Sequence, residues 1–114
     1  SGVLDFIKIN RFKNIKQFIC TGTPQNEIDI ILKQKNINKY FDGIYGSPKK
    51  KEEIIDEIIK KTSFKNDEIV FFGDALTDYN AASFHNINFI GVKSHHTIFP
   101  QNTFLIDNFD NFKF

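Results

Sequence analysis

Three groups of polar residues in this sequence have side chains that could do chemistry, and each follows a short apolar run. Thr21 follows the first run, a lysine triplet ending at Lys51 follows the second, and Asp74 and Asp78 follow the third. Hydroxyl and ammonium groups hold anions, whereas carboxylates hold divalent cations such as Mg²⁺. If the three groups meet, we expect a site for a phosphate ester and Mg²⁺.

Each group also has a purely structural interpretation. Thr21 could be a helix-capping residue, as Ser and Thr often are at strand-to-helix turns. Asp74 could be an N-cap and Asp78 an acidic residue favoured by the helix dipole. The triplet Lys49, Lys50 and Lys51 could be a solvated basic turn, although three cations in a first helical turn are locally unfavourable and a bound anion would relieve them.

The elements that must position these groups alternate along the chain. Turn signals and apolar periodicity predict strands at residues 17–20, 43–45, 68–72, 88–92 and 104–106. Helices are expected from the Thr23-Pro24 cap to about residue 34, from the lysine triplet onward, and over residues 76–84, whereas residues 3–9 fit a helix or a strand. This alternation predicts an α/β fold, a parallel Rossmann-like sheet with covering helices, in which the carboxyl ends of the strands share one rim.

Length and composition limit the classes of function. The chain has 114 residues, 40% of them hydrophobic and 25% charged, with a formal net charge of +1. We expect one domain over residues 1–114, no nucleic-acid surface because basic residues are not in excess, and no membrane span because no apolar stretch approaches about 20 residues. We expect a cytoplasmic protein.

The other residues that could react have simpler roles. Cys20 lies in an apolar run and is expected to be a buried, inert thiol. His95 and His96 are expected to be exposed, since no carboxylate or cysteine accompanies them, and His85 is expected to close a helix.

The three groups also carry a resemblance to a known family. Residues 18–24, 46–51 and 70–82 resemble, in order and spacing, the second, third and fourth motifs of the haloacid dehalogenase superfamily. The resemblance implies that Thr21 and Gly22 bind the transferring phosphoryl group and that Lys51 stabilises its charge. It also implies that Asp74 binds Mg²⁺ directly, with Asp78 as a further ligand or acting through water.

The first motif of that superfamily, Asp-x-Asp at the end of a strand, does not occur in this sequence; the nearest candidate, Asp5, lacks the second aspartate. Together with the lack of methionine, this indicates a C-terminal part of the core, with the nucleophile and the substrate-selecting cap upstream of Ser1. The resemblance implies a Mg²⁺-dependent phosphohydrolase acting on a small phosphomonoester through an aspartyl-phosphate, and the chain alone is expected to be inactive.

A missing first motif also means a missing central strand. We expect an N-terminal segment or a second chain to supply that strand, or else the strands at residues 17–20 and 68–72 to pair directly. Two other functions remain open, a receiver-like regulatory domain that binds phosphate or metal and a pseudoenzyme. Receivers place their acidic residues before Thr and Lys, which is the reverse of the order here. Phosphatase, phosphonatase and mutase share the core, so the sequence does not select among their substrates.

Overall fold

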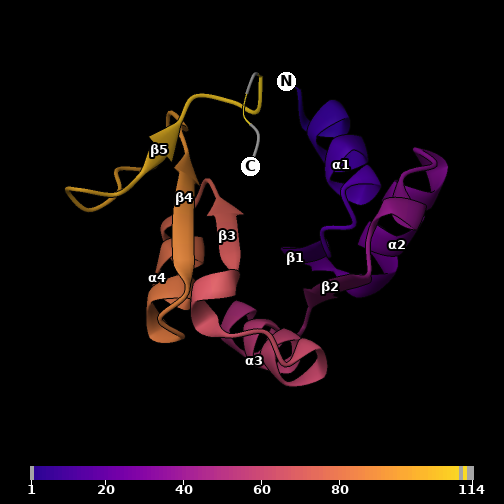
Figure 1. The fold of residues 1–114 in the computed structure, drawn as a ribbon, viewed down its shortest axis with the longest axis horizontal. Helices are drawn as coiled ribbons and strands as arrows, with labels where there is room; N and C mark the ends of the chain where they lie inside the picture. Colours follow the sequence, from indigo (N-terminus) through magenta and orange to yellow (C-terminus); the bar gives the residue numbers. More distant parts are fainter. Residues whose placement is uncertain (1, 111, 113–114) are drawn as a thin grey trace. The chain divides into compact units, whose positions relative to one another are not determined.

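The computed structural model describes residues 2–110 and residue 112 (Figure 1). Its elements run in the order α1 (Val3–Phe12), β1 (Phe18–Pro24), α2 (Gln25–Gln34), a 3₁₀ helix (Asn38–Tyr40), β2 (Gly43–Ser47), α3 (Lys51–Thr62), a second 3₁₀ helix (Asn66–Glu68), β3 (Val70–Gly73), α4 (Leu76–Phe84), β4 (Asn88–Val92) and β5 (Leu105–Ile106). No helix in this part of the chain combines the length and the apolar character needed to span a bilayer.

The strands form two parallel sheets, which confirms the predicted α/β class. β1 pairs with β2, and β3, β4 and β5 pair in that order, all in parallel. The described chain divides into two compact units: the first combines the residues up to Lys50 with the segment that starts at Phe109, and the second is Lys51–Asn108. β1 belongs to the sheet of the first unit and β3 to the sheet of the second.

In the first unit, the Gln25 side chain makes two hydrogen bonds to the backbone of β2, next to the irregular part of the β1–β2 pairing. The register shifts between Cys20 and Pro24. Just after this shift, the Gln25 amide donates to the Ile44 carbonyl at 3.0 Å and accepts the Gly46 N–H at 2.8 Å. The amide therefore satisfies two backbone groups of β2 that would otherwise lack a strand partner.

The beginning of α1 packs against the aromatic residues near the other end of the chain. Phe6 is 9% exposed, and its ring centroid lies 5.0 Å from that of Phe109 and 5.6 Å from that of Phe112. Gly2 precedes the helix with a φ of 75°, and a Cβ there would lie 2.8 Å from the Asp110 backbone nitrogen. Glycine is required here by both its conformation and its close approach.

The second unit has its core between α3, α4 and the β3–β4 pair, and Figure 1 shows α4 alongside these strands. The buried residues of this core are Ile55, Ala81, Ala82 and Ile87, and Phe71 and Phe89 pack against them. The small alanine side chains let α4 approach closely, as their pairing in the sequence predicts. This core fixes the ends of α4 and α3 that carry the candidate site.

Several expected element boundaries are wrong in detail. Thr23 does not cap α2, because β1 continues to Pro24 and α2 begins at Gln25 with no side-chain cap. β3 begins at Val70 rather than at residue 68, because the second 3₁₀ helix continues to Glu68. The Glu68 side chain accepts the Lys65 N–H at 2.8 Å and so caps the start of this 3₁₀ helix. Cys20 is half-buried rather than buried.

Candidate active site

The turn between β3 and α4 exposes one carboxylate and buries another. Asp74 directly follows β3, is exposed, and has no hydrogen bond or ion pair with any described residue. It is not an N-cap, because Ala75 occupies that position of α4. The exposed Asp74 carboxylate therefore remains available to a cation.

Asp78 is held in the first turn of α4 at 6% exposure. One of its oxygens, Oδ2, accepts the Ala75 N–H at 3.1 Å, which satisfies a backbone donor at the helix start. A Cβ on Gly73 would lie 2.6 Å from Asp78 Cγ, so the end of β3 must be glycine for this carboxylate to pack there. The Gly-Asp-x-x-x-Asp spacing thus has a steric reason as well as a chemical one.

Lys51, the first residue of α3, places its ammonium against the start of α4. Its Nζ lies 2.7 Å from Asp78 Oδ1 and donates to Thr77 Oγ1 at 2.9 Å. The Lys51 side chain is 21% exposed and that of Asp78 is 9% exposed. The structure therefore brings together two of the predicted residues, Lys51 and Asp78. It adds Thr77, which the sequence interpretation did not select although Thr77 lies inside the Gly-Asp-x-x-x-Asp motif.

The other two lysines of the triplet precede the helix, which corrects the expectation that all three lie in its first turn. Lys49 and Lys50 are exposed in the turn after β2, and α3 begins at Lys51. Lys49 Nζ lies 5.7 Å from the centroid of the Tyr45 ring. Only one lysine meets the unfavourable end of the α3 dipole, and of the triplet only Lys51 pairs with Asp78.

Thr21 and Gly22 lie in the first unit, near the end of β1. The Thr21 hydroxyl oxygen accepts the Thr23 N–H at 3.2 Å and lies 3.2 Å from the Thr23 hydroxyl. Gly22 is exposed, and a Cβ there would meet nothing within 4 Å. This segment thus combines a locally oriented hydroxyl with open space beside the Gly22 backbone.

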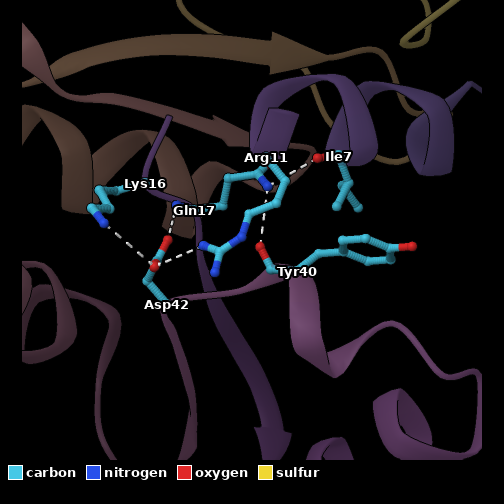
Figure 2. A network of polar contacts seen from close by, with 6 residues as sticks. All are labelled: Ile7, Arg11, Lys16, Gln17, Tyr40 and Asp42. Atoms are coloured by element: carbon cyan, nitrogen blue, oxygen red, sulfur yellow. Dashed lines mark hydrogen bonds and ion pairs between the residues drawn. The ribbon is translucent and has the colours of Figure 1, made fainter. Parts of the chain in front are cut away.

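The main polar network of the first unit centres on Asp42, which our sequence interpretation missed (Figure 2). Asp42 Oδ2 accepts the Gln17 N–H at 2.8 Å, and the Asp42 N–H donates to the Gln17 carbonyl at 2.7 Å. Arg11 Nη1 donates to Asp42 Oδ1 at 3.0 Å, and Lys16 Nζ lies 4.0 Å from the same oxygen. Gln17 lies 25 residues and Arg11 31 residues from Asp42 along the chain, so no local sequence pattern predicts these contacts.

This network changes the acidity of Asp42. Burial favours the neutral carboxyl, but the Gln17 N–H, the Arg11 hydrogen bond and the charges of Arg11 and Lys16 outweigh it, so the pKa of Asp42 lies below its ordinary value. The Gln17 side chain also donates to the carbonyls of Ile7 and Tyr40, at 3.0 and 3.2 Å. The network therefore ties α1 to the segments that enter β1 and β2.

The histidines lie as predicted. His95 and His96 are exposed, and His85 is the C-cap of α4 with its Nδ1 3.3 Å from the Ala81 carbonyl oxygen. Within residues 2–110 and 112, no three His, Cys, Asp or Glu side chains gather into a metal cluster.

Sequence comparison agrees with the motif assignment. Residues 1–92 match the family model of the haloacid dehalogenase-like hydrolases. This chain belongs to that family. No curated protein sequence matches it.

Solved structures of haloacid dehalogenase-like hydrolases and related phosphatases share the fold. A predicted phosphatase from Clostridium acetobutylicum is 21% identical, with a TM-score of 0.84 and coverage of 96% of this chain and 56% of the other. CbbY from Rhodobacter sphaeroides, in complex with Xylulose-(1,5)bisphosphate, is 19% identical, with a TM-score of 0.83 and coverage of 97% and 54%. The HAD-hydrolase YfnB from Bacillus subtilis, bound to magnesium, is 15% identical, with a TM-score of 0.79 and coverage of 96% and 51%. The chain thus spans about half the length of these structures.

Proposed function

We propose that this chain is the phosphate- and metal-binding part of a Mg²⁺-dependent phosphatase that acts on a small phosphomonoester. The observation that carries the proposal is the pairing of the Lys51 ammonium with the buried Asp78, on the helix that follows the exposed Asp74. Family membership and the phosphatases among the structures of similar fold support the same reaction class. The cytoplasm as its compartment stays a prediction from the sequence.

Each group has a chemical task in this proposal. Lys51 stabilises the negative charge that develops on the phosphoryl oxygens, because a fixed ammonium in a partly buried site interacts more strongly than one in water. Thr21 and the Gly22 backbone hydrogen-bond the phosphoryl group. Asp78 orients the ammonium, and its remaining lone pairs can accept from a water.

The carboxylates fit Mg²⁺ rather than a softer metal. Mg²⁺ takes oxygen ligands, keeps several waters and is commonly bound by one or two carboxylates together with substrate phosphate. Asp74 offers such an oxygen donor without a competing protein partner, and Asp78 can act through water. When bound, Mg²⁺ would neutralise phosphate charge at this rim.

The nucleophile belongs to the same proposal. An aspartate on an Asp-x-Asp segment attacks phosphorus, the bond to the leaving alcohol breaks, and water then hydrolyses the aspartyl-phosphate. No Asp-x-Asp occurs in the 114 residues. We propose that an N-terminal segment or a second chain supplies this aspartate on a strand that pairs with the apolar, half-buried edges of β1 and β3.

The test compares the 114-residue chain with the full-length protein that carries it. The chain alone should show no phosphate release from a panel of phosphomonoesters, whereas the full-length protein should turn over at least one of them with Mg²⁺ and lose activity with EDTA. Adding the N-terminal segment in trans should restore turnover to the chain. Hydrolysis by the chain alone would refute the proposal that the nucleophile lies outside these 114 residues. A full-length protein that binds phosphate and Mg²⁺ but has no activity would instead be a pseudoenzyme.

A further inference from the structure

Lys51 is held by two acceptors on neighbouring residues, Thr77 and Asp78, and not by an ion pair alone. Asp78 Oδ1 lies 2.7 Å and Thr77 Oγ1 2.9 Å from the Lys51 ammonium nitrogen. An ammonium has three N–H donors, so these two acceptors leave the third for another partner.

The second acceptor matters because a lysine side chain is flexible. A point charge on a four-carbon stem can rotate about a single ion pair, and ordering it costs side-chain entropy. Two acceptors at different directions fix the two engaged N–H bonds and therefore the direction of the third. Thr77 is exposed on α4, and its hydroxyl makes no other hydrogen bond in the described chain, so the contact with Lys51 is the one structural role that this hydroxyl has there.

The local electrostatics make such a support useful. Lys51 occupies the first position of α3, and its ammonium reaches the first turn of α4, so both helix dipoles disfavour the charge there. Asp78 balances the charge. Thr77 adds a neutral acceptor that restrains direction without cancelling the charge that the phosphoryl group needs.

We propose that Thr77 is a positioning residue, whose hydroxyl aims the Lys51 ammonium at the phosphoryl group. This inference rests on the proposed phosphatase function. It assigns to Thr77 a role in the rate of the chemical step, exerted through Lys51, and no contact with substrate.

The experiment compares Thr77→Val, which keeps the shape but loses the acceptor, with Thr77→Ser, which keeps the hydroxyl, in the full-length protein. Because a hydrogen bond to a charged group is lost, Thr77→Val should lower kcat about tenfold with little change in KM, and Thr77→Ser should stay within about twofold. Thr62→Val is the matched control, since the Thr62 hydroxyl donates to the Ile58 carbonyl and accepts the Phe64 N–H but, in the described part of the chain, makes no hydrogen bond with Lys51 or α4. It should leave kcat unchanged.

A second readout separates this inference from the proposed function. In ¹⁵N-labelled full-length protein, the Lys51 ammonium should give a slowly exchanging NMR signal that Thr77→Val removes and Thr77→Ser keeps. An inactive wild type would refute the phosphatase, and the ammonium signal would still decide whether Thr77 holds Lys51. The role of Thr77 would be overturned if all variants had equal kcat values or if the ammonium signal were unchanged in Thr77→Val. It would also be overturned if Thr77→Val and Thr77→Ser lost kcat equally and both had lowered melting temperatures.

Discussion

Asp42 in the first unit and Asp78 in the second are both carboxylates held by a cation and a backbone N–H, yet they sit in different kinds of network. The partners of Asp42 come from α1 and from the segment before β1, which are distant from Asp42 along the chain. The partners of Asp78 come only from the starts of α3 and α4. Near Asp78, moreover, Asp74 is exposed and has no hydrogen bond or ion pair with any residue that the structure describes.

The contacts of Asp42 connect segments of the fold, whereas Asp78 holds a lysine for which we propose a role in catalysis. Around Asp42, both oxygens and the backbone are used to connect elements, so its removal should reduce stability. Near Asp78, the Lys51 ammonium keeps one N–H donor for an anion, and the exposed Asp74 carboxylate can bind a cation. Substitutions in the two networks should therefore affect different observables.

The largest effect is expected from Asp74→Asn in the full-length protein. The amide keeps the shape but loses the negative charge, so Mg²⁺ binding should weaken and phosphatase activity should fall by about 100-fold or more. Calorimetric titration with Mg²⁺ and a phosphate-release assay measure the two losses. The melting temperature should not change, because an exposed, unpaired residue contributes little to folding. A variant with unchanged metal dependence would remove Asp74 from the site.

A somewhat smaller loss is expected from Lys51→Ala, compared with the same change at Lys49 and Lys50. Of the three, only Lys51 pairs with Asp78, so its removal should lower activity about 100-fold, the lower end of the loss expected for one charge-stabilising donor. The changes at Lys49 and Lys50 should stay within about twofold, and both serve as matched controls for the loss of one positive charge. Equal small losses at all three positions would favour a solvated basic turn.

The smallest effect is expected in the first unit, where Asp42→Asn should lower the free energy of unfolding by about 1 kcal/mol while the residues of the candidate active site stay intact. Asp56→Asn is the control, since its ion pair with Lys60, at 2.9 Å, is exposed and lies within one helix. That change should fall within about 0.5 kcal/mol. Urea unfolding at neutral pH measures both.

The same variant has a pH signature. Because the pKa of folded Asp42 lies below its unfolded value of about 3.9, the unfolded chain binds more protons in acid. The contribution of Asp42 is therefore fully present above that unfolded value and is lost as the pH falls through the lower folded pKa. The free energies of unfolding of wild type and Asp42→Asn should therefore differ by a constant amount near neutral pH and approach each other only as the pH falls below the unfolded value; a difference that stays constant in acid until both proteins unfold would contradict the assignment.

Local patterns predicted much of the fold. The apolar period and the flanking turn residues gave β4 as Asn88–Val92 and α4 as Leu76–Phe84, both as the structure has them. Boundaries failed where a side chain acts on a distant backbone, as when Gln25 bonds to β2 and allows β1 to run on to Pro24. Propensity alone contains no information about such contacts.

The candidate site was predictable to the same degree. The fixed spacing of Asp74 and Asp78 around one strand end made them visible in the sequence, as did the position of Lys51 at a helix start. Thr77 lies inside the same Gly-Asp-x-x-x-Asp motif, but its hydrogen bond with Lys51 could not be predicted from the sequence, because the two residues are 26 positions apart. Asp42 was missed for a similar reason, since its partners lie in segments distant along the chain.

The packing of Phe6 against Phe109 and Phe112 has a consequence for biosynthesis. Translation delivers α1 early, but its aromatic partners emerge only after all of Lys51–Asn108. The second unit is contiguous and can collapse on the ribosome while Phe6 still has no rings to pack against. Domains usually fold in the order in which they are made; here α1 leaves the ribosome before the second unit, yet its packing is completed after that unit has been made.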